Sequence, residues 1–360
     1  PPGPPGPRLA LASSERGARR RAFGESRRRQ SSQAHGTRPW GRQPWRRRPQ
    51  AGLMNGTGPA GLIAASKISR RFEQSGFICS TQVATALFLS DALGKPLLLE
   101  GPPGVGKTEI AKLWALFHDS DLIRLQCYEG LDEARALYEW SYGKQMLYAQ
   151  LLREKVGDLL SGAPDLKSSL GALKGQADEF FSRDFLLPRP LLAAITSDKP
   201  VVLLVDEVDR SDEEFEAFLL EVLSDYQVSI PELGTIRARS HPRVILTSND
   251  TRDLSDALRR RCLYLYIDFP PFEDEVRIVA GRVPGASEDL ARRIVRFVQQ
   301  LRKSDVRRSP GIAEVVDWAK ALVAVGADAL SADALRSTLG ALLKNRDDLD
   351  RVLADPGKYR

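Results

Sequence analysis

The sequence has few cysteines and no long apolar run. Its three cysteines, Cys79, Cys127 and Cys262, are widely spaced and form no C-x-x-C pair, so neither a disulfide framework nor a zinc site is predicted. No apolar stretch approaches the roughly 18 residues that a membrane-spanning helix requires. These absences argue against a disulfide-stapled scaffold and an integral membrane protein, and a reducing cytoplasm is the expected compartment.

Acidic residues and lysine are scarce in the first 53 residues. This segment has 13 arginines, no lysine and two acids, Glu15 and Glu25, which gives it a charge of +11. The whole chain has 53 basic and 47 acidic residues, so residues 54–360 have 40 basic and 45 acidic ones, a net charge of −5. The overall charge of +6 therefore comes from the N-terminal segment, and the remainder is not expected to bind nucleic acid over a large surface.

Residues 1–53 are rich in Pro, Gly, Arg and Ser and have hardly any aliphatic residues. Such a composition does not offset the entropy of ordering the chain, so we expect this segment to be disordered. Its arginine runs, with Trp40 and Trp45 between them, also suit binding to phosphates and bases. A different interpretation is that translation begins at Met54, the first methionine, which leaves the segment upstream. A transit peptide is disfavoured because PPGPPGP makes a poor amphipathic helix.

From Gly76 onward, short apolar strands alternate with helical periods, which is typical of an α/β domain with a parallel sheet. The expected strands are Leu97 to Glu100, Leu122 to Cys127, Val201 to Val205, Val244 to Thr247 and Leu263 to Ile267. After Pro270 no strand pattern remains, and helices with N-terminal caps dominate. We therefore predict an α/β core over residues 54–271, with a mostly helical insertion at about 128–200, and an α-helical domain over 272–360.

A phosphate-binding loop is the clearest motif. The run Gly101-Pro102-Pro103-Gly104-Val105-Gly106-Lys107-Thr108 matches G-x-x-x-x-G-K-[ST], directly after the strand LLLE and directly before the helical pattern TEIAKLWALF. Glycines allow the backbone N–H groups to point at phosphate oxygens, and the helix N-terminus adds its positive dipole end. Lys107 is then expected to reach the β and γ phosphates of ATP, and the Thr108 hydroxyl to coordinate Mg²⁺. The alternative is an ordinary Gly-Pro turn.

The apolar run VVLLV carries Asp206 and Glu207 at its C-terminal end, where parallel sheets bind their ligands. In P-loop enzymes an aspartate at this place holds the Mg²⁺ shell, so we assign that role to Asp206. Glu207 is then the candidate general base that polarises the attacking water. The alternative is a charged loop after a strand, which the P-loop one hundred residues earlier disfavours.

Two further segments carry candidate catalytic residues. Asn249 ends the apolar run VILTSN, where a neutral amide can position the lytic water, although an Asx turn is the common role of such a residue. Arg259, Arg260 and Arg261 end a short predicted helix. They complement the helix dipole there, or one of them acts as an arginine finger in the nucleotide site of a neighbouring subunit.

The ordered set GPPGVGKT, LLVDEVD, LTSND and ALRRRC, followed by a helical domain, resembles the AAA+ ATPases, and specifically the MoxR family. The segments FLLPRPLLAAI, CYEGLDEARALYEWSY and LSDALRRRCLYLYIDFP look like the subgroup linked to maturation of carbon monoxide dehydrogenase and related molybdenum hydroxylases. The resemblance runs from about Phe77 to Leu342. It implies a P-loop NTPase core of three layers with a parallel sheet, followed by a helical lid.

The resemblance also implies roles for particular residues. Asn249 matches sensor 1, Arg261 matches the arginine finger, and Arg260 is its nearest rival. Gln227 to Arg239 matches the hairpin inserted before sensor 1, and Tyr128 to Tyr142 matches the helix 2 insertion; both are expected to face the pore or a partner. The aromatic residues of the latter segment either contact that partner or pack against the core.

One position departs from the MoxR pattern. Many relatives have arginine where this chain has Gly311, in the sequence SPGIAE. The sensor 2 arginine is therefore either absent or supplied by Arg307 or Arg308.

Taken together, the resemblance implies a chaperone-like, Mg²⁺-dependent ATPase that converts ATP to ADP and phosphate. It implies a homo-oligomeric ring, expected to be a hexamer, that remodels a client protein, for instance a molybdenum hydroxylase, with a von Willebrand factor A domain partner. The alternative function is a nucleic-acid motor or clamp loader on the same core, which the charge of −5 disfavours. A GTP switch is disfavoured because no N-K-x-D motif follows the carboxylate strand.

Overall fold

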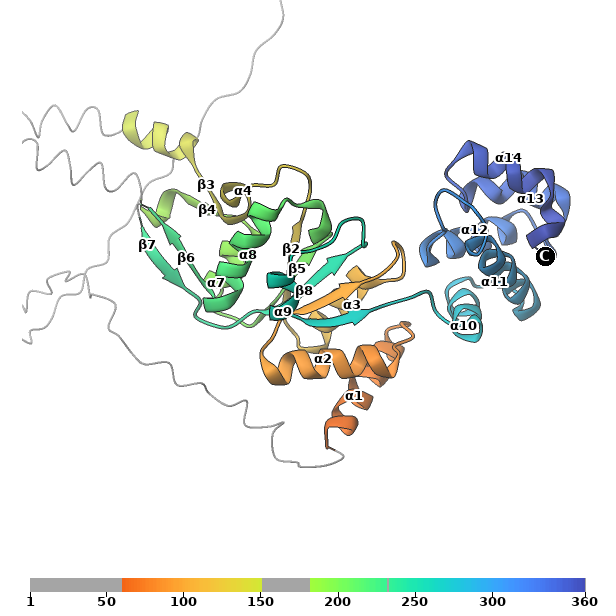
Figure 1. Ribbon diagram of the computed structural model, residues 1–360, viewed down its shortest axis with the longest axis horizontal. Helices are drawn as coiled ribbons and strands as arrows, with labels where there is room; N and C mark the ends of the chain where they lie inside the picture. The colour runs from red at the N-terminus through yellow and green to blue at the C-terminus, as the bar shows by residue number, and fades with distance from the viewer. Residues whose placement is uncertain (1–59, 151–181, 232, 360) are drawn as a thin grey trace, which may run out of the picture. The chain divides into compact units, whose positions relative to one another are not determined.

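The computed structural model describes residues 60–150, 182–231 and 233–359 (Figure 1). The arginine-rich segment, Met54 and residues 151–181 of the expected insertion fall outside these residues, so the structure does not test what we expect of them. Among the described residues, no helix is long and apolar enough to cross a membrane.

A parallel sheet of five strands forms the centre of the core. Its strands are β1 (Leu97–Glu100), β2 (Asp121–Gln126), β5 (Val201–Asp206), β8 (Arg243–Ser248) and β9 (Leu263–Tyr266). Their order across the sheet is β2-β5-β8-β1-β9, and every neighbouring pair is parallel. The five strands lie where the sequence predicts them, to within one residue at each end. The sheet brings the C-terminal ends of β1, β5 and β8 to one edge.

Helices cover both faces of this sheet (Figure 1). The helices of the core are α1 (Ala60–Gln74), α2 (Thr81–Leu93), α3 (Lys107–Phe117), α4 (Glu133–Leu137), α7 (Pro190–Thr196), α8 (Glu213–Asp225) and α9 (Asp256–Arg261), with the short η1 (Arg183–Phe185) and η2 (Val208–Arg210). The first three pack on one face, against side chains such as Leu97, Leu99 and Val202. The others with α numbers pack on the opposite face, against Leu98 and Leu203. The result is the predicted three-layer core.

Two small antiparallel hairpins accompany the core. β6 (Gln227–Ile230) pairs with β7 (Gly234–Arg237), as expected for the hairpin before Asn249. β3 (Tyr138–Trp140) pairs with β4 (Leu186–Pro188), so the segment LDEARALYEW, in the insertion expected to be mostly helical, ends as a strand. Only Glu133–Leu137 of that segment is helical, because β4, far along the chain, supplies a hydrogen-bonding partner that local periodicity does not reveal.

The aromatic residues of the predicted helix 2 insertion divide into two groups. Tyr128 is 43% and Tyr142 is 69% exposed. Tyr138 and Trp140 are half-buried and meet edge to face at 5.8 Å. Neither the packing role nor the partner role therefore holds for the whole set.

The C-terminal part consists of helices around its own apolar core. They are α10 (Phe272–Arg282), α11 (Glu288–Arg302), α12 (Ile312–Ala324), α13 (Ala332–Thr338) and α14 (Arg346–Ala354), with η3 (Leu339–Ala341) and η4 (Pro356–Tyr359). Ser287 and Ser331 cap α11 and α13, each by accepting a hydrogen bond from the backbone N–H three residues on. Trp318 and Phe297 are fully buried at the centre of this core. Among the described residues after Tyr266 there is no strand, as the sequence predicts.

Candidate active site

The P-loop joins β1 to α3 through three glycines with positive φ. Gly101, Gly104 and Gly106 have φ values of 150°, 81° and 103°, which glycine adopts at little cost. A Cβ on Gly101 would also lie 2.0 Å from the carbonyl oxygen of Ile267. Glycine is therefore required at this position for space as well as for conformation.

Lys107 is folded back over the loop. Its side chain is 6% exposed, and Nζ donates hydrogen bonds to the carbonyl oxygens of Gly101 at 2.6 Å and Pro102 at 2.8 Å. Burial lowers the Lys107 pKa to about 8, and neighbouring carboxylates, Asp209 foremost, oppose that shift. The ammonium group is thus held where the loop curls, as a phosphate-binding lysine requires.

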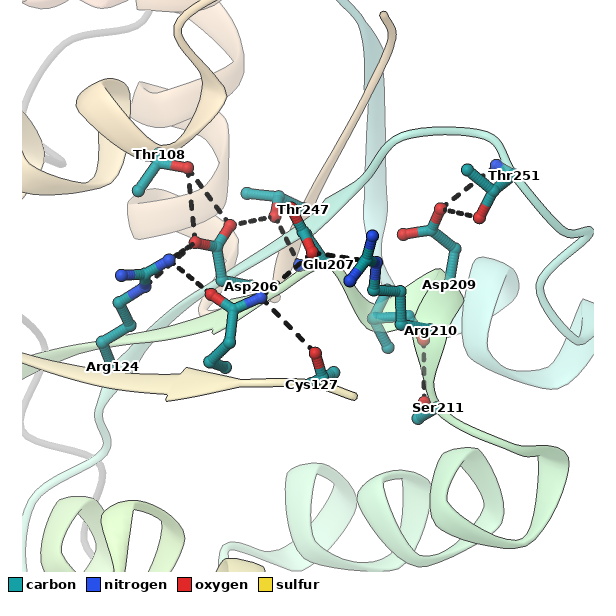
Figure 2. A network of polar contacts seen from close by, with 12 residues as sticks. Thr108, Arg124, Cys127, Asp206, Glu207, Asp209, Arg210, Ser211, Thr247 and Thr251 are labelled. Atoms are coloured by element: carbon teal, nitrogen blue, oxygen red, sulfur yellow. Dashed lines mark hydrogen bonds and ion pairs between the residues drawn. The ribbon is translucent and has the colours of Figure 1, made fainter. Parts of the chain in front are cut away.

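Asp206, at the end of β5, is the most heavily bonded carboxylate of the site (Figure 2). The Thr108 hydroxyl lies 3.2 and 3.4 Å from its two oxygens, and the Thr247 hydroxyl also donates to it. Arg124 on β2 donates to Oδ2 through Nε at 3.0 Å and through Nη2 at 2.6 Å. Hydroxyl and carboxylate oxygens are the ligands that Mg²⁺ prefers, so the donor set of Thr108 and Asp206 fits this cation.

Glu207 follows in the left-handed region, with φ of 56°. Its backbone N–H donates to the Thr247 hydroxyl at 2.9 Å, and its Oε2 lies 3.1 Å from Arg210 Nε and 3.2 Å from Gln126 Nε2. Strained backbone of this kind persists only where the surroundings hold it. Since the Glu207 side chain is 33% exposed, its carboxylate can meet a water molecule while Asp206 beside it is buried.

Several residues of this network are not singled out by sequence reasoning. They are Arg124, Gln126, Thr247 and Arg210. The two on β2 are polar residues two apart in the strand DLIRLQ, and Gln126 stands opposite Asp206 in the sheet register. The sequence pattern that could have indicated these residues is the alternation of polar side chains along β2. That pattern points to the carboxylates only once β2 is known to lie beside β5.

Asn249 directly follows β8, which lies between β5 and β1. In the register, Ser248 stands opposite Glu100, the last residue before the P-loop. Asn249 itself is partly exposed, and the next residue, Asp250, has a φ of 58°. The topology therefore brings Asn249 to the same edge as the P-loop and the two carboxylates.

The three consecutive arginines at the end of α9 differ in their surroundings. Arg259 is 30% exposed and forms an ion pair with Glu100 of its own chain. Arg260 is 82% exposed and lies 3.7 Å from the equally exposed Asp256, a kind of pair that contributes little. Arg261 is also exposed. Arg261 and Arg260, which the resemblance matches to the finger and its nearest rival, are thus the two of the three that are open to solvent.

Gly311 lies against the P-loop, which explains why arginine does not stand here. The Ile312 N–H donates to the Gly104 carbonyl oxygen at 3.0 Å, and a Cβ on Gly311 would lie 2.8 Å from Gly104 Cα. Of the two candidate substitutes, Arg307 pairs with Asp347 at 2.8 Å, and Arg308 is exposed.

The three cysteines are buried and free. Burial raises the pKa of Cys79 to about 11 and that of Cys127 and Cys262 to about 12. They therefore remain protonated thiols at neutral pH. Within the described ranges, no group of three or more His, Cys, Asp or Glu residues is arranged to hold a metal ion.

A P-loop, an adjacent strand ending in two carboxylates and a parallel five-stranded sheet together define a nucleotide-binding P-loop ATPase of the AAA+ fold. Residues 96–262 match the family model of the AAA domain (dynein-related subfamily). This match runs from β1 to the end of α9 and includes the P-loop, the two carboxylates after β5, Asn249 and the three arginines of α9. β9 and the helical domain lie outside it.

Two curated relatives are named as gas vesicle ATPases. GvpN of Haloferax mediterranei is 28% identical over 252 residues, which are 66% of this chain and 67% of that protein. GvpN1 of Halobacterium salinarum is 26% identical over 223 residues, 59% of this chain and 57% of that protein. The chain therefore spans about two thirds of the first relative and somewhat over half of the second.

Among solved structures, the chain is similar to the Holliday junction branch migration motor RuvB of Thermotoga maritima. The match has 20% sequence identity and a TM-score of 0.41, and covers 74% of this chain and 68% of that one. A point mutant of the same motor matches with 18% identity and a TM-score of 0.42, over 76% of this chain and 69% of that one.

Proposed function

We propose that this protein hydrolyses ATP with Mg²⁺ and uses the cycle to remodel a client protein. The observation that carries the proposal is the convergence of Thr108, Asp206 and Glu207 at the sheet edge beside the P-loop. Thr108 and Asp206 would hold Mg²⁺, which neutralises the charge on the phosphates. Glu207 would accept the proton of the attacking water, and Asn249 would orient that water.

The helical C-terminal part, the lid, would convert the ATPase cycle into movement. Gly311 opens α12 and lies directly on the P-loop through the Ile312–Gly104 hydrogen bond. A change in P-loop conformation on phosphate binding would therefore be transmitted to α12. Closure of two packed parts around a ligand is a common way to convert binding into movement.

We further propose a homo-oligomeric ring, a hexamer, in which an arginine completes the neighbouring site. The exposure of Arg260 and Arg261 supports this arrangement, because a finger must leave its own subunit to reach another nucleotide.

For the client, the motifs resemble the subgroup that matures molybdenum hydroxylases, so we propose cofactor insertion into such a metalloenzyme, with a von Willebrand factor A domain partner. Both matched relatives are named gas vesicle ATPases, so a gas vesicle protein is the competing client. Stimulation of the ATPase rate by an apo-hydroxylase would support the maturation role. A rate that double-stranded DNA stimulates and the apo-hydroxylase does not would favour a nucleic-acid motor instead.

The catalytic assignment is tested by Glu207→Gln. We expect this variant to bind ATP with unchanged affinity and to lose turnover by about 10²- to 10⁴-fold, since the amide cannot accept the proton. Fluorescent-nucleotide binding and phosphate release measure the two properties. Asp225→Asn, a carboxylate change at the end of α8, serves as control. Normal turnover by Glu207→Gln would refute the assignment.

The ring is tested by mixing subunits. Arg261→Ala alone should bind ATP without hydrolysing it, because its neighbours receive no finger. Adding Lys107→Ala subunits, which keep the finger but have a disabled site of their own, should restore turnover in mixed rings. An inactive mixture that co-elutes as one assembly would contradict the assignment of Arg261.

A further inference from the structure

The buried carboxylate of Glu100 has no part in the chemistry above. Glu100 ends β1, directly before Gly101, and is 3% exposed. Its oxygens accept Nη1 and Nη2 of Arg259 at 3.4 and 3.1 Å and the hydroxyl of Tyr264 at 2.9 Å. The Arg259 guanidinium also lies 5.8 Å from the centre of the Tyr264 ring. Removing these partners would leave a buried charge unpaired, which is costly.

This cluster ties two functional elements of one subunit together. Glu100 directly precedes the P-loop, and the Gly101 carbonyl next to it is the acceptor of Lys107 Nζ. Arg259 lies in the last turn of α9, directly before Arg260 and Arg261. Since those two are exposed, the direction in which they point depends on how the last turn of α9 is held.

α9 has a second anchor at its other end. The backbone N–H of Ser255, its N-cap residue, donates to Glu216 at 2.8 Å, and Arg252 pairs with the same buried carboxylate. Leu258 between the two anchors is fully buried. The N-terminal anchor comes from α8, whereas the C-terminal one comes from the strand that leads into the P-loop.

We propose that Glu100 and Arg259 form a clamp. Glu100 lies in the strand that leads into a subunit's own P-loop, and by holding Arg259 it positions Arg260 and Arg261 toward the nucleotide site of the neighbouring subunit. Arg259 is thereby a positioning residue rather than a finger. The inference rests on the proposed ring, and it adds that each subunit presents its finger from the strand that leads into its own nucleotide site.

The test separates finger presentation from a subunit's own catalysis. Acceptor subunits carry Arg260→Ala with Arg261→Ala, so they bind ATP but present no finger. Donor subunits carry Lys107→Ala, so their own site is disabled and only their finger is measured. The donor then receives Arg259→Met, or Glu100→Gln, which keeps the shape of the side chain and removes its charge. A matched donor carries Arg277→Met instead, because Arg277 forms an exposed pair with Asp274 on α10.

We expect the Lys107→Ala donor and its Arg277→Met version to restore turnover equally. The Arg259→Met donor should restore about 10- to 100-fold less, which is the scale for a misplaced catalytic group, and the Glu100→Gln donor should also fall below the control. Thermal melting and co-elution with the acceptor establish that each donor is folded and assembled. Full rescue by both clamp donors, or an equal loss with Arg277→Met, would overturn the clamp while leaving the trans finger intact. Failure of the Lys107→Ala donor itself would instead overturn the trans arrangement, and the clamp with it.

Discussion

Lys107 shows how burial sets the chemistry of one side chain. Its ammonium group is enclosed by the P-loop and donates to two backbone carbonyls. Burial disfavours the charged form and lowers its pKa to about 8, while the carboxylates of Asp209, Asp206, Glu207 and Glu100 keep the shift from being larger. The lysine is therefore charged at pH 7 but close to losing its proton.

This pKa predicts that ATP binding weakens as the pH rises. Above about pH 8 the free protein loses the Lys107 charge that attracts phosphate, so the Kd for ATP should increase about tenfold between pH 7 and pH 9. Nucleotide titrations at constant ionic strength measure the Kd at each pH. Lys107→Arg is the control, because a guanidinium keeps its charge over this range and any remaining binding should be flat with pH. A flat wild-type profile, or the same slope in Lys107→Arg, would contradict the prediction.

Residues outside the sequence motifs, Arg124 on β2 and Thr247 on β8, hold Asp206 together with the motif residue Thr108. A carboxylate that is 3% exposed is costly unless it is paired and hydrogen-bonded. Arg124 provides the charge, while the Thr108 and Thr247 hydroxyls provide hydrogen bonds. The network explains how an acidic side chain can remain buried beside the apolar strand that leads to it.

At the scale of elements, one buried ion pair joins the end of α11 to α10. Arg302 is 7% exposed and Glu275 fully buried, with two parallel bonds of 2.8 and 2.9 Å. Arg302 also donates from Nε to the carbonyl of Pro310 at 2.9 Å and stacks over Phe269 at 3.8 Å. Because Pro310 precedes Gly311, this pair holds the segment that lies on the P-loop.

We expect Glu275→Ala to lower the free energy of unfolding by about 3 to 5 kcal/mol, because it leaves the Arg302 charge buried and unpaired. The double variant Glu275→Leu with Arg302→Met should recover much of that loss, since it removes both charges. Urea unfolding measures the stabilities. Arg277→Met, which breaks an exposed pair in the same domain, should cost less than about 1 kcal/mol. An equal loss of unfolding free energy in Glu275→Ala and Arg277→Met would show that burial of the Arg302 pair does not set its cost.

At the scale of the whole molecule, local patterns predict the fold well. The five strands and the P-loop follow from apolar runs and glycine positions, which depend on neighbours in the sequence. The strand at Tyr138–Trp140 was not predicted because its partner, Leu186–Pro188, lies far along the chain. Arg124 and Arg259 were missed as contacts for the same reason, since their carboxylate partners are brought near by strand order and helix packing. What sequence reasoning lacks is the pairing of distant elements.

The distribution of charge over the chain gives a last prediction. Every residue placed at the candidate site lies within residues 54–360, whose net charge is −5. We expect a protein shortened to begin at Met54 to hydrolyse ATP at the rate of the full chain. We also expect it to lose the salt-sensitive DNA binding that 13 arginines should give the full chain, because that binding depends on counterion release. ATPase assays measure the turnover, with the shortened Lys107→Ala protein as the background, and fluorescence anisotropy over a salt series measures the DNA binding.

A substantial loss of turnover on shortening would give residues 1–53 a part in the reaction. DNA binding that survives the shortening would instead place a basic surface within residues 54–360 and favour the nucleic-acid motor.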